Sequence, residues 1–166
     1  AAAAGKALCA DRVYLSDVLT ERLEIGKKIG ADYLINAKEE DAFEILMEET
    51  EGMGVDYAIE SSGTKEGLDL AVKALKRNGK ILLLGIPHDP VPIDLKNLSL
   101  NDKDIVSVRG ESRTNVGRAV SLLSNGRVNL KPLVTHSFPI SRYKEAFHTS
   151  NNRIEGAMKV VIKPQE

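Results

Sequence analysis

Short apolar runs alternate with segments of helical periodicity along most of the chain. Strands are predicted at Val13–Ser16, Tyr33–Ile35, Val55–Ile59, Ile81–Leu84 and Ile105–Val108. Helices are predicted at Thr20–Gly30, at Ala42–Thr50, and wherever apolar residues recur at positions i, i+3, i+4 and i+7, as in Leu68, Ala71, Val72 and Leu75 and again in Val116, Ala119, Val120 and Leu123. This alternation predicts an α/β fold with a doubly wound parallel sheet.

Local signals mark the ends of several helices. Thr20 is the expected N-cap of its helix and Gly30 its stop, while Gly79 and Gly126 are expected to end the two later helices. The run Ile81–Leu84 is apolar throughout, which is typical of a strand covered on both faces.

The last part of the chain has a different character. From about Lys131 onward we expect a strand at Pro132–Ser137, a short capped helix at Ser141–His148 and a final strand at Lys159–Lys163.

Composition narrows the class of protein. With 42% hydrophobic and 28% charged residues among 166, the chain is not a disordered tail. Twenty-three Lys and Arg against 24 Asp and Glu leave a formal net charge of −1, which gives no electrostatic reason to expect a nucleic acid or a membrane as partner. A single cysteine, Cys9, excludes an intrachain disulfide and favours a cytoplasmic location. We expect this thiol to be buried.

Candidate chemistry lies where the predicted strands end, because open parallel sheets bind ligands at the carboxyl ends of their strands. Asp17 ends the first strand. Its carboxylate could accept two hydrogen bonds from a ribose diol and would repel a 2′-phosphate, favouring NAD over NADP. The alternative is that Asp17 only lies near the N-terminus of the next helix, where an acid is favourable.

The later strands end near glycines, which allow a ligand to approach the backbone. The sequences at these ends are Glu60-Ser61-Ser62-Gly63, Leu84-Gly85-Ile86 and Val108-Arg109-Gly110. Ordinary turn chemistry explains any one of these glycines equally well. Together with Asp17, they favour a nucleotide-binding crevice.

Other catalytic motifs find no support in the sequence. His88, His136 and His148 are scattered, no His-Glu-x-x-His motif occurs, and no Gly-x-Ser-x-Gly nucleophile is present, so we predict no metal ligands and no catalytic residues in this chain.

The Gly-rich loop of a dinucleotide fold is expected roughly 20 residues before an acid such as Asp17. Ala1–Leu8 is typical of a helix already in progress, so we expect that loop, and the strand before it, to precede Ala1. In the strand order 3-2-1-4-5-6 of a dinucleotide-binding sheet, that preceding strand would be strand 1, at the centre. Its absence would separate strands 2 and 3 from strands 4, 5 and 6 and leave the chain poorly stable by itself.

Several runs taken in order resemble the medium-chain, zinc-dependent alcohol dehydrogenases. They are Ser16–Leu23, Lys27–Asp32, Gly54–Tyr57, Glu60–Gly63 and Gly79–Gly85. The later run Val128–Pro139 is most similar to sorbitol and other polyol dehydrogenases. The similarity covers essentially the whole chain.

The resemblance implies a Rossmann-type NAD-binding domain over residues 1–130, incomplete at its N-terminus, and a segment over 131–166 that returns to the catalytic domain. It also implies a set of cofactor-binding residues: Asp17, Arg22, Ser61, Ser62, Gly63, Leu84, Gly85, Ile86, Glu111, Ser112, Arg113 and Lys159. Within this set, Asp17 and Arg22 would contact the adenosine ribose, Lys159 the phosphates, and Arg113 also the substrate.

The family's catalytic and structural zinc ions are held by an N-terminal domain that this sequence does not contain. The resemblance therefore implies the cofactor-binding part of an NAD- and zinc-dependent dehydrogenase that oxidises a small alcohol or polyol, forms a dimer or tetramer, and is inactive as this piece alone. Two alternatives stay open at this point. One is a non-catalytic nucleotide-binding module that needs a partner, and the other is a Rossmann methyltransferase.

Overall fold

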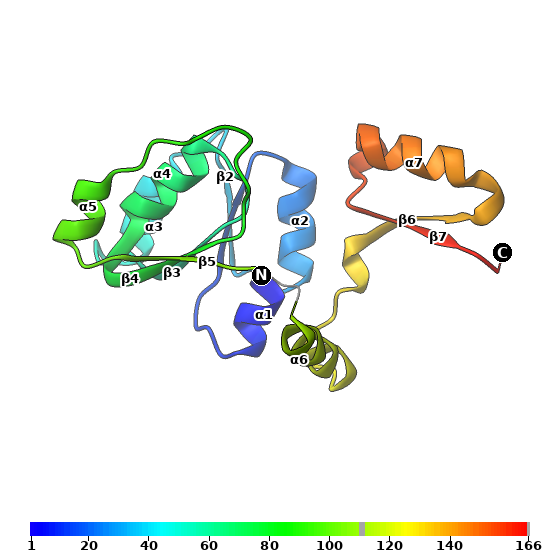
Figure 1. The fold of residues 1–166 in the computed structure, drawn as a ribbon, viewed down its shortest axis with the longest axis horizontal. Helices are drawn as coiled ribbons and strands as arrows, with labels where there is room; N and C mark the ends of the chain where they lie inside the picture. The colour runs from blue at the N-terminus through cyan, green and yellow to red at the C-terminus, as the bar shows by residue number, and fades with distance from the viewer. Residues whose placement is uncertain (110–111, 166) are drawn as a thin grey trace. The chain divides into compact units, whose positions relative to one another are not determined.

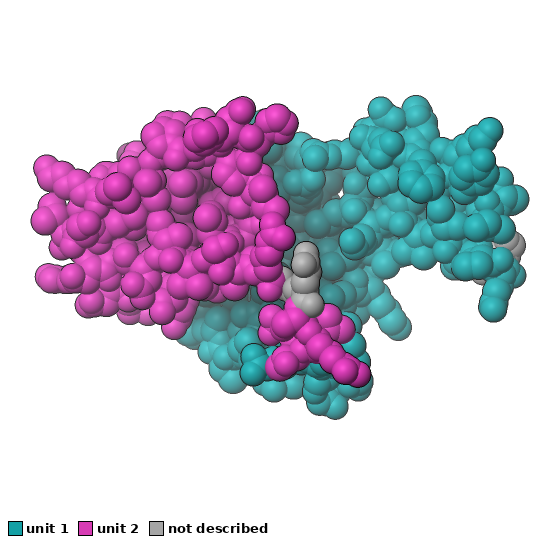
Figure 2. All heavy atoms as spheres, in the orientation of Figure 1, with its two compact units in different colours: residues 1–38, 117–166 teal, residues 39–116 magenta. Residues whose placement is uncertain are grey.

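The computed structural model describes residues 1–109 and 112–165 and has an α/β fold in which every paired strand is parallel to its neighbour. The chain divides into two compact units, drawn in different colours in Figure 2. Unit 1 comprises Ala1–Lys38 and Gly117–Glu166, and unit 2 comprises Glu39–Val116. The predicted fold class is confirmed, whereas the domain division at residues 130 and 131 stays a prediction.

Unit 1 contains two separate two-stranded parallel sheets and the helices around them. Its elements are α1 (Ala2–Ala7), β1 (Tyr14–Asp17), α2 (Thr20–Lys28), β2 (Tyr33–Asn36), most of α6 (Arg113–Ser124), the 3-10 turns Lys131–Leu133, Ile140–Arg142 and Ile154–Gly156, β6 (Val134–Pro139), α7 (Tyr143–Asn152) and β7 (Lys159–Lys163).

The first sheet of unit 1 pairs β1 with β2, and α2 packs close to it. The pairing runs from Tyr14 beside Tyr33 to Asp17 beside Asn36, and the two tyrosine rings stack with their centroids 4.7 Å apart. Gly26 of α2 faces Leu15, whose side chain would collide with any Cβ at that position. A glycine in the middle of α2 therefore permits the close approach of helix and strand.

The start of α2 differs from the prediction. Leu19, and not Thr20, is the N-cap, and its side chain makes no capping bond. The Thr20 hydroxyl instead accepts a hydrogen bond from the Asn36 amide at 3.3 Å.

The second sheet of unit 1 pairs β6 with β7, which α7 connects (Figure 1). Phe138 and Ala146 are buried between strand and helix. The strand Lys159–Lys163 is confirmed in full. β6 lies two residues later than the predicted strand, because the chain first forms a 3-10 turn at Lys131–Leu133 around Pro132. α7 begins two residues later and ends four residues later than the predicted helix, and the 3-10 turn Ile140–Arg142 precedes it.

Unit 2 contains a three-stranded parallel sheet in the order β3-β4-β5. Its elements are α3 (Ala42–Glu49), β3 (Val55–Glu60), α4 (Lys65–Ala74), β4 (Leu75–Leu83), α5 (Leu95–Leu100) and β5 (Asp104–Ser107). In Figure 1, α4 lies along this sheet. The core between them consists of Ala71, Val72, Leu75, Ile81 and Leu98.

Side chains that sequence analysis overlooked begin the helices of unit 2. Asp41 accepts hydrogen bonds from the first-turn amides of α3, Thr64 accepts one from Gly67 in α4, and Asp94 accepts one from Asn97 in α5. Each supplies the side-chain oxygen that the unpaired amides at a helix start require.

Gly79 does not end α4, contrary to the prediction. The helix ends at Ala74, and Leu75 has the extended backbone angles φ −72° and ψ 133° of a strand residue. Leu75 is nevertheless buried in the same core as Val72. The helical spacing of apolar residues therefore continues past the end of the helix, which explains the error.

The expectation that the run Ile81–Leu84 is covered on both faces is wrong in this structure. Ile81 is completely buried under α4, whereas Leu84 is 46% exposed. Ile59 and Val106, the partners of Leu82 on the neighbouring strands, are 43% and 38% exposed. Only one face of the β3-β4-β5 sheet is well covered.

The predicted separation of the strands is confirmed. β1 and β2 pair with each other in one sheet, while β3, β4 and β5 pair in another. These are the two groups that the loss of a central strand from the order 3-2-1-4-5-6 would produce.

Candidate cofactor-binding residues at the strand ends

Asp17 ends β1 in unit 1, and its carboxylate is already engaged by its own chain. One oxygen, Oδ1, accepts hydrogen bonds from the amides of Val18 at 2.7 Å and Leu19 at 3.0 Å. The other, Oδ2, accepts one from the Arg22 guanidinium at 3.4 Å. A carboxylate oxygen has two acceptor positions, so Oδ2 still has room for one hydroxyl donor.

The geometry of Asp17 is compatible with both interpretations of its role, and its contact with a ribose stays a prediction. It holds the turn that leads into α2, where a negative charge is favourable. It also keeps one acceptor position beside a guanidinium, and its side chain is 23% exposed. Arg22, the second predicted ribose contact, lies directly beside it and is 37% exposed.

In unit 2, the loop after β3 is organised by Glu60, which is only 5% exposed. Its Oε1 accepts hydrogen bonds from the Ser62 amide at 2.7 Å, the Ser62 hydroxyl at 2.5 Å and the Gly63 amide at 3.1 Å. Two of the predicted cofactor-binding residues, Ser62 and Gly63, are thus fixed by a carboxylate that sequence analysis did not select. Its position at the end of a strand is the signal that could have identified it.

The loop after β3 touches the loop after β4. The amides of Leu84 and Gly85 both donate to the Glu60 carbonyl oxygen, at 2.8 and 2.9 Å. Gly63 has φ +70°, and a Cβ there would lie 2.8 Å from the Ile86 carbonyl oxygen. A Cβ on Gly85 would lie 2.8 Å from the Gly63 Cα. Glycine is therefore required at both positions for the two loops to meet. The structure brings together four of the predicted cofactor-binding residues, Ser62, Gly63, Gly85 and Ile86, and their role in binding a cofactor stays a prediction.

A pocket of about 370 Å³ opens at the carboxyl ends of β4 and β5. It is lined by Leu83, Leu84, Gly85, Ile86, Ser107, Val108 and Arg109. The lining combines apolar side chains with polar groups, among them one hydroxyl and one guanidinium, a mixture that small-molecule sites also show. Three of the predicted residues line it, while Arg109 is a lining residue that sequence analysis did not select.

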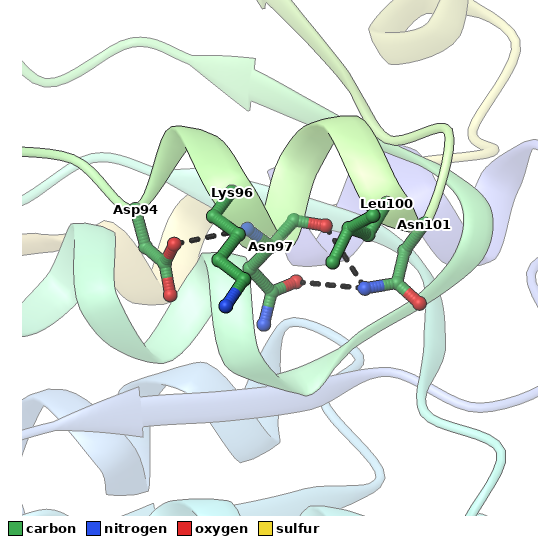
Figure 3. A pocket seen from close by; sticks show the side chains of 5 residues that line it. All are labelled: Asp94, Lys96, Asn97, Leu100 and Asn101. Atoms are coloured by element: carbon green, nitrogen blue, oxygen red, sulfur yellow. Dashed lines mark hydrogen bonds between the residues drawn. The ribbon is translucent and has the colours of Figure 1, made fainter.

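A second pocket, of about 250 Å³, lies beside α5 and is lined by Asp94, Lys96, Asn97, Leu100 and Asn101 (Figure 3). Its polar groups bond to one another. The Asp94 carboxylate accepts from the Asn97 amide at 2.9 Å, and the Asn101 side chain donates to the Asn97 carbonyl at 2.9 Å. None of the predicted site residues lines this pocket, so we assign it no ligand.

The other predicted residues have mixed positions. The Ser112 hydroxyl accepts a hydrogen bond from the Asn115 amide at 3.1 Å and so supports the first turn of α6, which begins at Arg113. Lys159 is exposed at the first position of β7 in unit 1. Ser61 is exposed in the loop after β3. Glu111, together with Gly110, lies outside the described residues.

No metal centre can be built from the described part of the chain, because no group of three or more His, Cys, Asp or Glu side chains comes together there. The expectation that the Cys9 thiol is buried is wrong: Cys9 follows α1 with φ +70° and is exposed.

A sequence profile of the family described as "Zinc-binding dehydrogenase" matches residues 1–125 of the chain. The chain belongs to the zinc-binding dehydrogenase family. This assignment confirms the resemblance inferred from the strand-end sequences and removes the methyltransferase alternative.

Named relatives agree with this family and differ in substrate. The chain is 35% identical over 164 residues to an L-threonine 3-dehydrogenase of Pyrococcus horikoshii and 30% identical over 165 residues to a sorbitol dehydrogenase of Bacillus subtilis. These alignments cover 97% and 99% of this chain but only 47% and 46% of the relatives. The chain thus spans about half the length of the curated relatives it matches.

Solved structures of dehydrogenases share the fold. A benzyl alcohol dehydrogenase from Acinetobacter calcoaceticus superposes with a TM-score of 0.85 at 30% identity, covering 98% of this chain and 45% of its own. An Escherichia coli oxidoreductase of unknown specificity superposes with a TM-score of 0.89 at 28% identity, covering 97% and 46%. Among the described residues, no helix is long and apolar enough to cross a membrane.

Proposed function

We propose that this chain is the cofactor-binding part of a dehydrogenase that transfers hydride from a small secondary alcohol or polyol to NAD. The observation that carries the proposal is the pair of glycine-containing loops after β3 and β4, which meet beside a pocket at the carboxyl ends of β4 and β5. Such an edge is where open parallel sheets bind nucleotides.

The pocket suits the nicotinamide end of the cofactor. A flat, largely apolar ring needs an apolar wall and close access to the backbone, and Leu84, Gly85 and Ile86 provide both. When bound, the cofactor supplies the hydride acceptor. The residues of this chain bind and orient it and keep water from its ring.

The adenosine ribose is assigned to Asp17 and Arg22. The remaining acceptor position on Asp17 Oδ2 suits a ribose hydroxyl, and its negative charge opposes a 2′-phosphate. These two residues support NAD over NADP. Lys159 is assigned to the cofactor phosphates and Arg113 to the nicotinamide side and the substrate. For these two residues, the support is the resemblance of the sequence alone.

The zinc ion that names the family is assigned to residues outside this chain. The described residues offer no group of ligands for it, so they do not fit a zinc site, and we derive no step through the metal. We further propose a cytoplasmic location and a dimeric or tetrameric assembly. The relatives named for threonine and for sorbitol both support an alcohol as the substrate class.

The test is a titration of NADH and NADPH, followed by nicotinamide fluorescence, with the natural protein that contains this chain. We expect NADH to bind at least tenfold more tightly than NADPH. Repulsion between the Asp17 carboxylate and the 2′-phosphate of NADPH should cost about 1.4 kcal/mol or more, which corresponds to a tenfold difference in Kd. The variant Asp17→Asn is expected to reduce that preference. The matched control is Asp11→Asn, a carboxylate whose side chain is 98% exposed. If the natural protein binds neither dinucleotide, the proposal is wrong.

A further inference from the structure

Glu60 carries a buried charge for which the proposed function gives no role. The partners of its carboxylate are all donors, namely the amides of Ser62 and Gly63 and the Ser62 hydroxyl. The Ser62 hydroxyl also accepts from the Thr64 amide at 3.1 Å and lies 2.9 Å from the Thr64 hydroxyl, where either oxygen could donate. The hydrogen bonds from the two backbone amides favour a negative charge on this carboxylate.

Among the residues that the structure describes, no cation pairs with this charge. None of the ion pairs formed within residues 1–109 and 112–165 includes Glu60, so only neutral hydrogen-bond donors stabilise its carboxylate. Because Glu60 is only 5% exposed, little solvent screens its field.

The charge lies against a wall of the pocket. A Cβ on Gly85 would collide with Glu60 Oε2, so the carboxylate is in direct contact with this glycine. Gly85, in turn, lines the pocket between Leu84 and Ile86. One glycine backbone therefore separates the buried negative charge from the space assigned to the nicotinamide ring.

The two redox forms of the cofactor differ in charge at that ring. The oxidised nicotinamide carries one positive charge, and the reduced ring is neutral. A nearby buried negative charge stabilises the oxidised ring more than the reduced ring. Arg109 has the opposite effect, but it is exposed at the rim of the pocket, and solvent screens it more strongly.

We propose that Glu60 acts as an electrostatic residue of the nicotinamide site that favours binding of the oxidised over the reduced cofactor. This inference rests on the proposed function, because it requires the ring to occupy the pocket beside Gly85.

The test measures dissociation constants for NAD⁺, NADH and ADP-ribose by calorimetry, using the natural protein that contains this chain. In Glu60→Gln, the ratio of the NADH to the NAD⁺ dissociation constant is expected to fall by about fivefold, because one charge at close range is removed. The ADP-ribose constant should not change, since that ligand lacks the ring. The control Glu66→Gln makes the same substitution at an exposed carboxylate in the first turn of α4 and should leave the ratio unchanged.

The possible results separate the two proposals. If the natural protein binds none of the three ligands, the proposed function fails, and this inference fails with it. If the cofactors bind but Glu60→Gln leaves the ratio within twofold of wild type, or weakens all three ligands equally, the charge has no selective role and the inference is overturned. Should Glu60→Gln not fold, Glu60→Asp decides the question. The shorter Asp side chain moves the carboxylate away from the pocket, so the ratio of the NADH to the NAD⁺ dissociation constant should fall by about twofold. An unchanged or higher ratio overturns the inference.

Discussion

Replacing Gly85 by alanine should break the junction between the loops after β3 and β4. The added methyl carbon would lie 2.8 Å from the Gly63 Cα and closer still to the Gly63 amide nitrogen and Glu60 Oε2. The obstruction includes backbone atoms, which cannot rotate away as a flexible side chain can. One of the two loops must therefore move.

The size of the effect follows from what that movement disrupts. Overpacking a well-filled site typically costs about 1–3 kcal/mol. Separating the loops also weakens the hydrogen bonds from the Leu84 and Gly85 amides to the Glu60 carbonyl, each worth about 1 kcal/mol. We expect a loss of local stability of about 3 kcal/mol, which is a large part of the stability of a typical domain.

Hydrogen exchange at the amides of Leu84 and Gly85 measures this loss directly. A decrease of about 3 kcal/mol corresponds to an increase in exchange rate on the order of a hundredfold. The matched control is Gly117→Ala in α6, where an added Cβ meets no atom within 4 Å. That variant should be neutral or should stabilise the helix by up to about 1 kcal/mol. Equal exchange at Leu84 and Gly85 in the Gly85→Ala variant and wild type would refute the reasoning.

Two further predictions concern the pH dependence of stability. Burial lowers the pKa of Lys103 in the folded protein, although Asp94 acts in the opposite direction. Between this lowered pKa and the unfolded pKa of about 10.4, the unfolded chain binds more protons than the folded chain. The free energy of unfolding should therefore rise with pH in that range. Urea midpoints of wild type and Lys103→Met between pH 8 and 10 check this, and parallel curves would contradict it. The hydrogen bond from the Val13 amide, together with Lys6, lowers the pKa of Asp32 in the folded protein. The Asp32 carboxylate should therefore contribute fully to the free energy of unfolding above the unfolded pKa of about 3.9, and this contribution should be lost as the pH falls through the lower, folded pKa. Acid unfolding of Asp32→Asn, with Asp11→Asn as the control, measures this contribution, and an advantage of wild type that persists at the lowest pH would show that another cause is at work.

Most elements of the fold could be predicted because local pattern and tertiary packing agree. The strand Val55–Glu60 and the helix Ala42–Glu49 each lie within one residue of their predicted bounds. One error, the position at which α4 ends, arises because one residue serves two elements. Leu75 continues the apolar face of α4 while its backbone already belongs to β4, and no periodicity distinguishes these two states.

The candidate site could be predicted in part. Glycines at strand ends identified Gly63 and Gly85, because only a residue without a Cβ allows the two loops to meet. Glu60 was recognised only as a strand-end residue and not as a site residue, because its contacts with Ser62 and Gly63 depend on tertiary burial, which the sequence does not display. Asp17 was selected correctly as a strand-end acid, but its bonds to Val18 and Leu19 depend on the turn geometry after β1. The expectation that the chain is poorly stable by itself stays a prediction.

The proposed function places the nicotinamide ring in the pocket at the carboxyl ends of β4 and β5, beside the junction of the loops after β3 and β4. Hydrogen exchange of the natural protein, measured with and without saturating NADH, tests this claim most directly. Bound NADH is expected to slow exchange in the segments 60–64 and 83–87 and to leave α5, beside which the second pocket lies, unchanged. Unchanged exchange in both loops at saturating NADH would contradict the claim.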